Sequence, residues 1–440
     1  MDDVDPQPTR DVQVGIAPVS DTLIAIGASS IDTIDAMTAG VLFEPGRIGP
    51  VTTANRIVRA GTSETAAGES GEVTDDIVDI YETLARNRVG LILSGHMFCH
   101  PRGRYATRQV GIHEDGMVPG LTRLVEAVHR HGGKVFAQLA HAGSQSRVAD
   151  NRPLAPSPIP NALTGRMVDA ASQDEIEEAV GAFASGAARA VQAGFDGVHI
   201  HGANGYLISE FSSPLTNRRT DGWGASPEGR DTFVVEVLKA VRKAVPANMA
   251  VTVKLGLQDA VPEGMQLSEG VRRGEILATV GADAIEVSCN AMRLPSDSAK
   301  EYVAVGPKRA LGDLLLHRFL SPPYPEAYFL EPAKQLRRRF SKPIILVGGM
   351  RTPATMERIV ERGDADFVAL ARPFIREPDL VMKLAEGRRG PVACTSCNLC
   401  LMHESHHSLR CWRVPRRRLW DHAIYRIRGG FGEVHRPHTA

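Results

Sequence analysis

Residues 194–206 read GFDGVHIHGANGY, and the stretch divides into an apolar half and a polar half. The first half has the pattern of a buried strand, and the glycines and asparagine that follow indicate a loop. His201, Asn204 and Tyr206 are therefore expected where a rigid strand gives way to a loop. An imidazole and an amide can donate hydrogen bonds to a carbonyl oxygen, and a phenol can give up a proton. This set suits a reaction that builds an enolate and then protonates it.

Short β-branched runs of the same kind recur along the chain. They start at Asn55, Gly90, Lys134, Gly197, Met249, Ala284, Pro343 and Phe367. Helical patterns lie between them, for example at 74–88 and 119–131, and a Ser-x-x-Glu capping box at Ser172 opens a long Ala-rich helix. Apolar strands that alternate with helices indicate a parallel sheet covered on all sides. Eight such repeats predict the α/β class and a closed (β/α)8 TIM barrel.

The composition excludes several classes of protein. At 440 residues with 43% hydrophobic content, the chain can bury a sizeable core. Lys plus Arg equals Asp plus Glu at 51 each, so the whole molecule has no general attraction for nucleic acid or anionic membranes. The start lacks the basic and apolar regions of a secretory signal, and no apolar run is long enough to span a bilayer. We therefore expect a soluble, cytoplasmic protein that acts on a small molecule, and we leave open whether it forms a homo-oligomer.

The pattern also predicts the domain organisation. Residues 1–40 mix short apolar runs with Asp, Ser, Pro and Thr, and we expect a poorly ordered or docking extension there. Residues 41–390 form the predicted barrel, and residues 391–440 form a cysteine-rich, arginine-rich segment. Its last part, from Trp412, is interpreted as a solvated tail, with docking on the barrel or on a partner as alternatives.

Functional groups of TIM barrels collect at the C-terminal ends of the strands. The residues that the pattern places there are Ser63, His96, Gln138, His201, Asn204, Lys254, Gly348, Gly349 and Arg372. Loops after the seventh and eighth strands commonly bind phosphate through backbone N–H groups. Gly348 and Gly349 follow the seventh strand, and Ala371 and Arg372 follow the eighth. These loops predict a phosphate site, with a tight turn and a surface arginine as the alternative.

Two further residues have the chemistry that a flavin ring requires. Gln138 offers a donor and an acceptor in fixed geometry, which matches the mixed pattern of the pyrimidine edge. Arg230 opens the helix after the fourth strand and would bring a cation to the place where negative charge collects on reduction. A structural glutamine and a solvated arginine are the alternative interpretations of these two residues.

Residues 194–226, GFDGVHIHGANGYLISEFSSPLTNRRTDGWGAS, resemble the Old Yellow Enzyme family of FMN-dependent oxidoreductases. Further segments are similar to that family and occur in its order: LFEPGRIGPVTTANRIVRA from Leu42, QLAHAGSQS from Gln138, LVGGM from Leu346 and ALARPFIREPDL from Ala369. The resemblance covers roughly residues 42–387. It implies a barrel that binds FMN without a covalent bond across its C-terminal face and uses NAD(P)H as co-substrate.

The resemblance also implies roles for single residues. By position, Gln138 and Arg230 would contact the flavin ring, Gly348, Gly349, Ala371 and Arg372 would hold its phosphate, and Ser63 would lie near N5 and O4. His201 and Asn204 would hold the carbonyl group of the acceptor, and Tyr206 would be the proton donor.

Four of the six cysteines form the pattern Cys394-x2-Cys397-x2-Cys400-x10-Cys411. Four thiolates at this spacing can hold a [4Fe–4S] cluster or a structural zinc ion. The string CTSCNLCL resembles the cluster-binding segment of the branch that includes 2,4-dienoyl-CoA reductase and trimethylamine dehydrogenase. Members of that branch continue into further nucleotide-binding domains, whereas this chain ends soon after Cys411. An iron–sulfur cluster, zinc and unligated thiols therefore stay open as alternatives.

Together these patterns predict an oxidoreductase that takes hydride from NAD(P)H through FMN and reduces an activated alkene conjugated to a carbonyl. Flavin-dependent oxidation or demethylation of an amine is one alternative. A Schiff-base lyase with Lys254 as its nucleophile is a second alternative, from another reaction class. A flavin-binding carrier without catalytic activity is a third.

Overall fold

The structure is a computed structural model that describes residues 40–148, 150–161, 165–290, 326–404 and 406–428. The expected N-terminal extension, apart from Gly40, lies outside the described residues, as do residues 291–325. None of the helices in the described part of the chain combines the length and apolar character that a membrane crossing needs.

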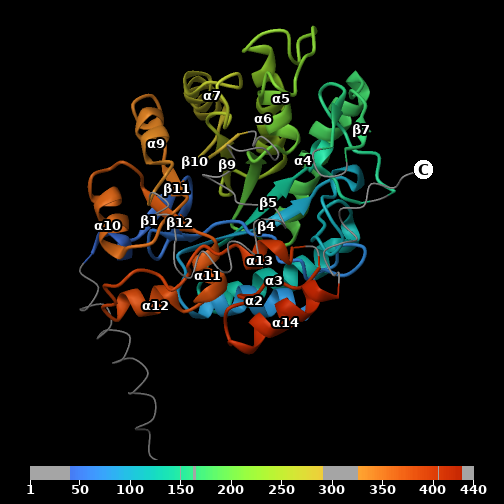
Figure 1. Ribbon diagram of the computed structural model, residues 1–440. Coiled ribbons are helices and arrows are strands. Elements are labelled where there is room, and N and C mark those ends of the chain that lie inside the picture. The colour runs from blue at the N-terminus through green and yellow to red at the C-terminus, as the bar shows by residue number, and fades with distance from the viewer. Residues whose placement is uncertain (1–39, 149, 162–164, 291–325, 405, 429–440) are drawn as a thin grey trace, which may run out of the picture. The chain divides into compact units, whose positions relative to one another are not determined.

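Eight parallel strands close into a barrel, in the order β10-β11-β12-β3-β4-β5-β8-β9 (Figure 1). Their bounds are β3 Ile57–Arg59, β4 Leu91–Phe98, β5 Val135–Ala140, β8 Gly197–Gly202, β9 Ala250–Gly256, β10 Ala284–Ser288, β11 Ile344–Val347 and β12 Phe367–Leu370. Each strand falls on one of the eight predicted runs, with β4 continuing two residues beyond its run to Phe98, so the prediction of a TIM barrel is confirmed.

Helices cover the barrel from outside (Figure 1). They are α2 Asp75–Arg86, α3 Val118–His129, α4 Gln173–Gln192, α5 Leu207–Ser212, α6 Thr232–Ala244, α7 Leu267–Val280, α9 Leu330–Arg337, α10 Pro353–Glu361, α11 Arg372–Arg376 and α12 Leu380–Ala385. The predicted capping box is present at the start of α4. The Ser172 side chain accepts from the Glu175 backbone N–H at 3.3 Å, and the Glu175 side chain accepts from the Ser172 N–H at 2.9 Å. Both bonds satisfy donors that the first turn of a helix leaves free.

Two small hairpins complete the strand inventory. They pair β1 Gly46–Ile48 with β2 Val51–Thr53, and β6 Ile159–Pro160 with β7 Met167–Val168. Short 3-10 turns lie at η2 Val41–Phe43, η3 Pro101–Gly103, η4 Asp115–Met117, η5 Gly143–Gln145 and η6 Gly229–Asp231. Ile48 and Val51 of the first hairpin belong to the apolar cluster inside the barrel. The hairpin therefore helps to close the inner core.

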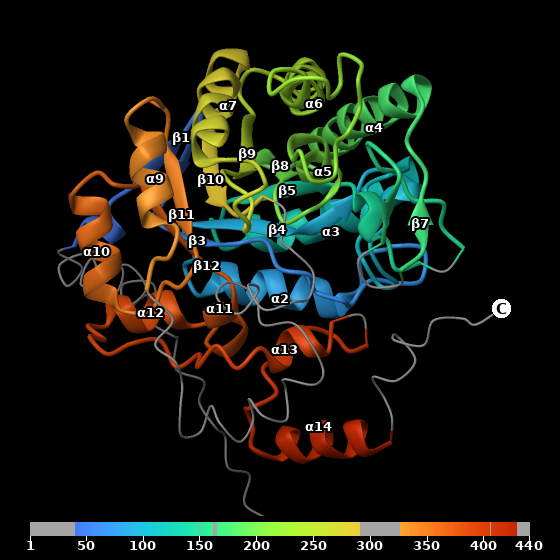
Figure 2. The same cartoon turned by 45° about the horizontal axis from the view of Figure 1, so that its top comes forward.

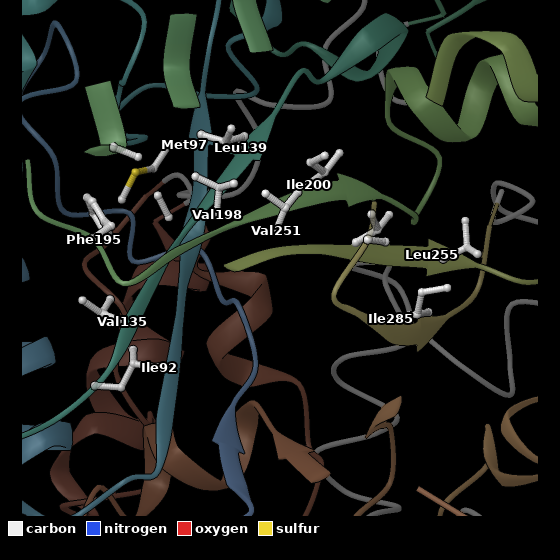
Figure 3. Close-up of a cluster of buried hydrophobic side chains, with 14 of the residues drawn as sticks. Ile92, Met97, Val135, Leu139, Phe195, Val198, Ile200, Val251, Leu255 and Ile285 are labelled. Carbon is white, nitrogen blue, oxygen red and sulfur yellow. The ribbon is translucent and has the colours of Figure 1, made fainter. Parts of the chain in front are cut away.

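Successive strand residues face opposite sides of the barrel wall. Ile92, Val135, Val198 and Val251 belong to the large cluster of buried apolar side chains that also contains helix residues (Figure 3). The smaller cluster inside the barrel includes Leu91, Leu93, Phe136, Ala250, Ala284 and Phe367. Further polar side chains lie buried on β8, β9 and β10, namely His199, His201, Thr252, Lys254 and Glu286. The packed barrel thus holds a group of polar side chains in fixed positions.

The C-terminal segment contains α13 Leu399–Met402 and α14 Arg417–Ile427. Both views show these helices on the same side of the barrel as α2 and α11 (Figures 1 and 2). The Leu409 N–H donates to the Glu64 carbonyl at 2.7 Å, which ties the segment to the loop after β3. The Trp412 side chain is buried and stacks on His403 with ring centroids 3.5 Å apart. Trp412 and His422 are buried, whereas Val414, Trp420 and Ile424 are exposed, so residues 412–428 dock in part and keep a largely solvated surface. Residues 429–440 lie outside the described residues.

Candidate active site

The three residues of the opening motif lie together at the end of β8. Asn204 and Gly205 have φ of +62° and +76°, so the chain turns through the left-handed region. This turn brings the ring of Tyr206 to a centroid distance of 4.8 Å from His201. The Asn204 backbone N–H donates to the Cys289 carbonyl at 3.0 Å, and its side-chain amide lies 3.4 Å from the Ser288 hydroxyl. The loop is therefore anchored to the end of β10.

Two more aromatic rings complete this group. The His96 ring, from β4, lies 6.3 Å from His201 and 5.6 Å from Tyr206, measured between centroids. The Tyr105 ring lies 5.6 Å from both His96 and Tyr206. Tyr105 was missed at the sequence level, because it stands in an irregular loop without any periodic pattern. We refer to His96, Tyr105, His201 and Tyr206 as the aromatic group.

A buried network of charged and polar side chains lies beside the aromatic group. The Lys254 Nζ is 3.2 Å from one oxygen of the Glu286 carboxylate, and the His199 Nε2 is 2.9 Å from the other. The second ring nitrogen of His199 lies 2.7 Å from the Thr252 hydroxyl. Burial alone would raise the pKa of Glu286, but Lys254 and His199 more than offset it and lower the pKa to about 2. The carboxylate is therefore ionised at neutral pH and balances the buried ammonium.

The two imidazoles of the aromatic group are neutral at neutral pH. Burial, followed by Lys254 and His96, lowers the pKa of His201 well below its usual value. Burial and the nearby cations Arg147 and Lys254 lower the pKa of His96 to about 4, against a smaller opposing backbone hydrogen bond. Burial raises the pKa of Tyr206, with a contribution from Glu404. The site thus combines neutral imidazole donors with a phenol that keeps its proton.

Unmet hydrogen-bond donors show where a bound group fits. In the described part of the chain, Gln138 Nε2 and His201 Nδ1 are buried without a partner. Buried polar atoms rarely stay unpaired in a functional assembly. At Gly61, an added Cβ would come within 2.6 Å of Gln138 Nε2, so the chain passes close to this amide only because glycine stands there. These donors fit the carbonyl and nitrogen edges of a flavin and of a carbonyl compound.

Arg230 does not join this group. It lies on η6 and donates to the Glu269 carboxylate of α7 at 2.8 Å, in the helix layer around the barrel. Lys254 instead pairs in register with His201 across β8 and β9. The cation that the structure brings beside His201 is therefore Lys254. In the sequence, the position of Lys254 at the end of a strand was the signal that it lies at the site. From the sequence alone, Lys254 is interpreted only as a nucleophile or as an ion-pair partner.

The predicted phosphate loops follow neighbouring strands, since β11 pairs with β12. Gly348 and Gly349 have φ of +109° and +72°, a conformation that glycine adopts without strain. Ala371 precedes α11, and the side chain of Arg372 donates to Asn398 in the cysteine-rich segment. The loop backbones thus lie side by side as predicted, while the Arg372 side chain contacts the C-terminal segment.

Ser63, the remaining predicted flavin contact, lies in the loop after β3. Its hydroxyl is 3.4 Å from that of Thr65. The C-terminal segment reaches the same loop, because the Leu409 N–H donates to the Glu64 carbonyl at 2.7 Å. The segment therefore lies at the same end of the barrel as the aromatic group.

The four clustered cysteines line one cavity of about 80 Å³, together with Arg372 and Arg376. The Arg376 guanidinium donates to the Cys411 sulfur at 3.8 Å. Burial and the neighbouring Cys394 and Cys397 raise the pKa of Cys400 to about 12. Within the described residues, no three His, Cys, Asp or Glu side chains are arranged to hold a single metal ion. The four thiols thus share one cavity with two arginines.

Residues 41–390 match the family described as the NADH:flavin oxidoreductase / NADH oxidase family. The chain belongs to this family. The family and the barrel that the motifs predicted are thus confirmed.

Relatives and solved structures give the same result. The chain is 33% identical to NADH oxidase of Thermoanaerobacter brockii, over 84% of this chain and 54% of the relative. It is 33% identical to 4,4'-dithiodibutanoate disulfide reductase of Rhodococcus erythropolis, over 82% of this chain and 92% of the relative. The solved Old Yellow Enzyme homologue from Zymomonas mobilis superposes with a TM-score of 0.64 at 26% identity, covering 80% of this chain and 94% of that one. The chain thus spans about half the length of the first of these relatives and most of the other two.

The Glu286 network generates a stability prediction. Glu286→Gln leaves the buried ammonium of Lys254 without its counter-charge, and breaking a buried pair in this way costs about 3–5 kcal/mol. The free energy of unfolding, measured with urea at pH 7, should fall by that order. Glu236→Gln breaks the exposed pair of Glu236 with Lys239 and should cost less than about 1 kcal/mol.

The same variant has a defined pH signature. The folded-state pKa of Glu286 is about 2 against an ordinary value of 4.5. Its contribution to stability is therefore complete above pH 4.5 and is lost as the pH falls toward 2. Between these limits, the stability of the wild type should fall more steeply with decreasing pH than that of Glu286→Gln. Parallel curves would contradict the assignment of the charge to Glu286.

Proposed function

We propose that the chain is an FMN-dependent oxidoreductase that uses NAD(P)H to reduce an alkene conjugated to a carbonyl group. The observation that carries the proposal is the convergence of His201, Asn204 and Tyr206 beside the unpaired amide of Gln138. Two neutral donors and one protonated phenol within a single site match the needs of carbonyl activation followed by proton transfer.

The roles of the residues follow from their chemistry. Bound FMN would supply the hydride, which it receives from NAD(P)H. The His201 imidazole and the Asn204 amide would donate hydrogen bonds to the acceptor's carbonyl oxygen, on which negative charge grows during the reaction. A single donor of this kind is worth roughly 3 to 4 kcal/mol. Tyr206 would then protonate the carbon next to the carbonyl, because its phenol is held in the protonated form.

The flavin would be held by residues at the C-terminal ends of the strands. Gln138 would contact the polar edge of the ring, and Ser63 would lie near it. Lys254 would place a positive charge beside the ring, the role that the sequence pattern gave to Arg230. The backbones at Gly348, Gly349, Ala371 and Arg372 would contact the phosphate, supported by the left-handed turn at the two glycines.

The Schiff-base lyase is disfavoured by the surroundings of Lys254. An amine must lose its proton before it can attack a carbonyl carbon. The Lys254 nitrogen is instead held in an ion pair with Glu286 at 3.2 Å. Amine oxidation would use the same flavin site, but the His201 and Asn204 donors suit a carbonyl oxygen better than an amine.

Tyr206→Phe should separate the two half-reactions. The phenylalanine ring keeps the aromatic packing but has no proton to give, so alkene reduction should slow by about 10²- to 10⁴-fold. Bleaching of the flavin absorbance by NAD(P)H, followed by stopped flow under anaerobic conditions, should keep its rate. A wild-type protein that binds no FMN would refute the proposed function, and equal slowing of both steps would refute only the role of Tyr206.

Two cation variants test which residue faces the flavin. Lys254→Met should weaken FMN binding by roughly tenfold or more, since it removes a charge-assisted contact. Arg230→Met should leave the FMN dissociation constant unchanged, because Arg230 pairs with Glu269 in the helix layer. The dissociation constant is measured by fluorescence quenching of free FMN added to deflavinated protein. Weaker FMN binding by Arg230→Met together with unchanged binding by Lys254→Met would assign the flavin contact to Arg230.

For the cysteine cavity we propose a [4Fe–4S] cluster rather than zinc. A zinc site gathers four ligands around one ion, whereas a cluster needs thiolates placed around a larger body. The cavity of about 80 Å³ supports the second arrangement. Protein purified without oxygen should contain iron and acid-labile sulfide in equal amounts, and Cys397→Ser should lose both. Cys99→Ser, at a buried cysteine outside the cavity, is the matched control, and zinc in place of iron would reject the cluster.

A further inference from the structure

The aromatic group has a cation at its border that the proposed reaction does not use. Arg147 stands in the loop after η5, and its guanidinium lies 4.5 Å above the ring of Tyr105. Its backbone N–H donates to the Tyr105 carbonyl at 2.7 Å, which fixes this loop against the loop after β4. The charge is therefore held at one position at the edge of the site.

The charge of Arg147 acts on several groups of the site. It contributes to lowering the pKa of His96, and it opposes the burial that raises the pKa of Tyr206 and of Tyr105. The Tyr105 ring below the guanidinium is 5.6 Å from the rings of His96 and Tyr206, so the charge lies beside the space that the aromatic group surrounds. Arg147 is thus part of the same site as His201 and Tyr206.

Arg147 also has unused binding capacity. Its Nε is buried and has no hydrogen-bond partner among the residues that the structure describes. Guanidinium groups pair preferentially with carboxylates, often through two parallel hydrogen bonds. A buried donor without a partner is costly unless a ligand satisfies it. The arginine is therefore suited to an anionic group of a ligand.

We propose that Arg147 is a specificity-determining residue that binds a carboxylate on the acceptor. This inference rests on the proposed function, since it names the class of acceptor. The acceptor would extend from the carbonyl held by His201 and Asn204 to a negatively charged end over Tyr105. Neutral carbonyl compounds would lack the second contact.

Equilibrium binding tests the proposal without any turnover. The probes are 4-hydroxyphenylacetate and its primary amide, which have nearly the same shape and differ in charge. Each is titrated into the FMN-loaded protein in an isothermal calorimeter. A hydrogen bond between charged groups predicts that the wild type binds the acid roughly ten- to hundredfold more tightly than the amide.

The Arg147 variants lower this ratio to different extents. Arg147→Gln should abolish the preference for the acid, and Arg147→Lys should keep part of it. Arg152→Gln, at an arginine whose side chain is 74% exposed, should leave the ratio as in the wild type.

Three results would overturn the proposal: no binding of either probe, equal binding of the acid and the amide by the wild type, or a preference that persists in Arg147→Gln. The FMN content of each variant and its bleaching by NAD(P)H are measured in parallel. Variants that keep both have a folded barrel. If NAD(P)H does not bleach the flavin of the wild type, the proposed function is rejected. The calorimetric preference for the acid would still show whether Arg147 binds a carboxylate.

Discussion

The buried carboxylate of Glu286 is the constraint on which the candidate site depends. An ammonium group inside a barrel is unfavourable without a nearby negative charge, and Glu286 supplies it to Lys254 at 3.2 Å. Through its second oxygen the same carboxylate orients His199, which in turn bonds to Thr252. The Glu286 side chain of β10 therefore balances the charge of Lys254 on β9 and orients His199 on β8, both close to His201.

The positive charge of Lys254 affects the protonation state of His201. Burial and Lys254 together keep His201 in its neutral form, so the imidazole can donate a hydrogen bond while the proton stays on the ring. Tyr206 keeps its proton because its surroundings are buried. His201 is thus suited to donate a hydrogen bond and Tyr206 to donate a proton because of the surroundings of each side chain, and not because of their residue types alone.

The C-terminal segment adds a second level of organisation. It is tied to the loop after β3 through Leu409, and its cysteines line a cavity that Arg372 also lines. The Arg372 side chain, at the start of α11, contacts Asn398 of the same segment. The segment therefore contacts both the loop after β3 and the loop after β12.

The sequence by itself determined the barrel and the principal catalytic candidates, because both rest on local patterns. Short β-branched apolar runs located all eight strands, the Ser172 capping box located the start of α4, and the spacing of His201, Asn204 and Tyr206 placed all three on one turn. Only the tertiary structure decided which distant residues meet them. Arg230 and Lys254 look alike as cations in the sequence, yet pairing of β9 with β8 brings only Lys254 to the site. Tyr105, Arg147 and Glu404 come from loops without periodicity, and their positions follow from how those loops pack, which no local pattern records.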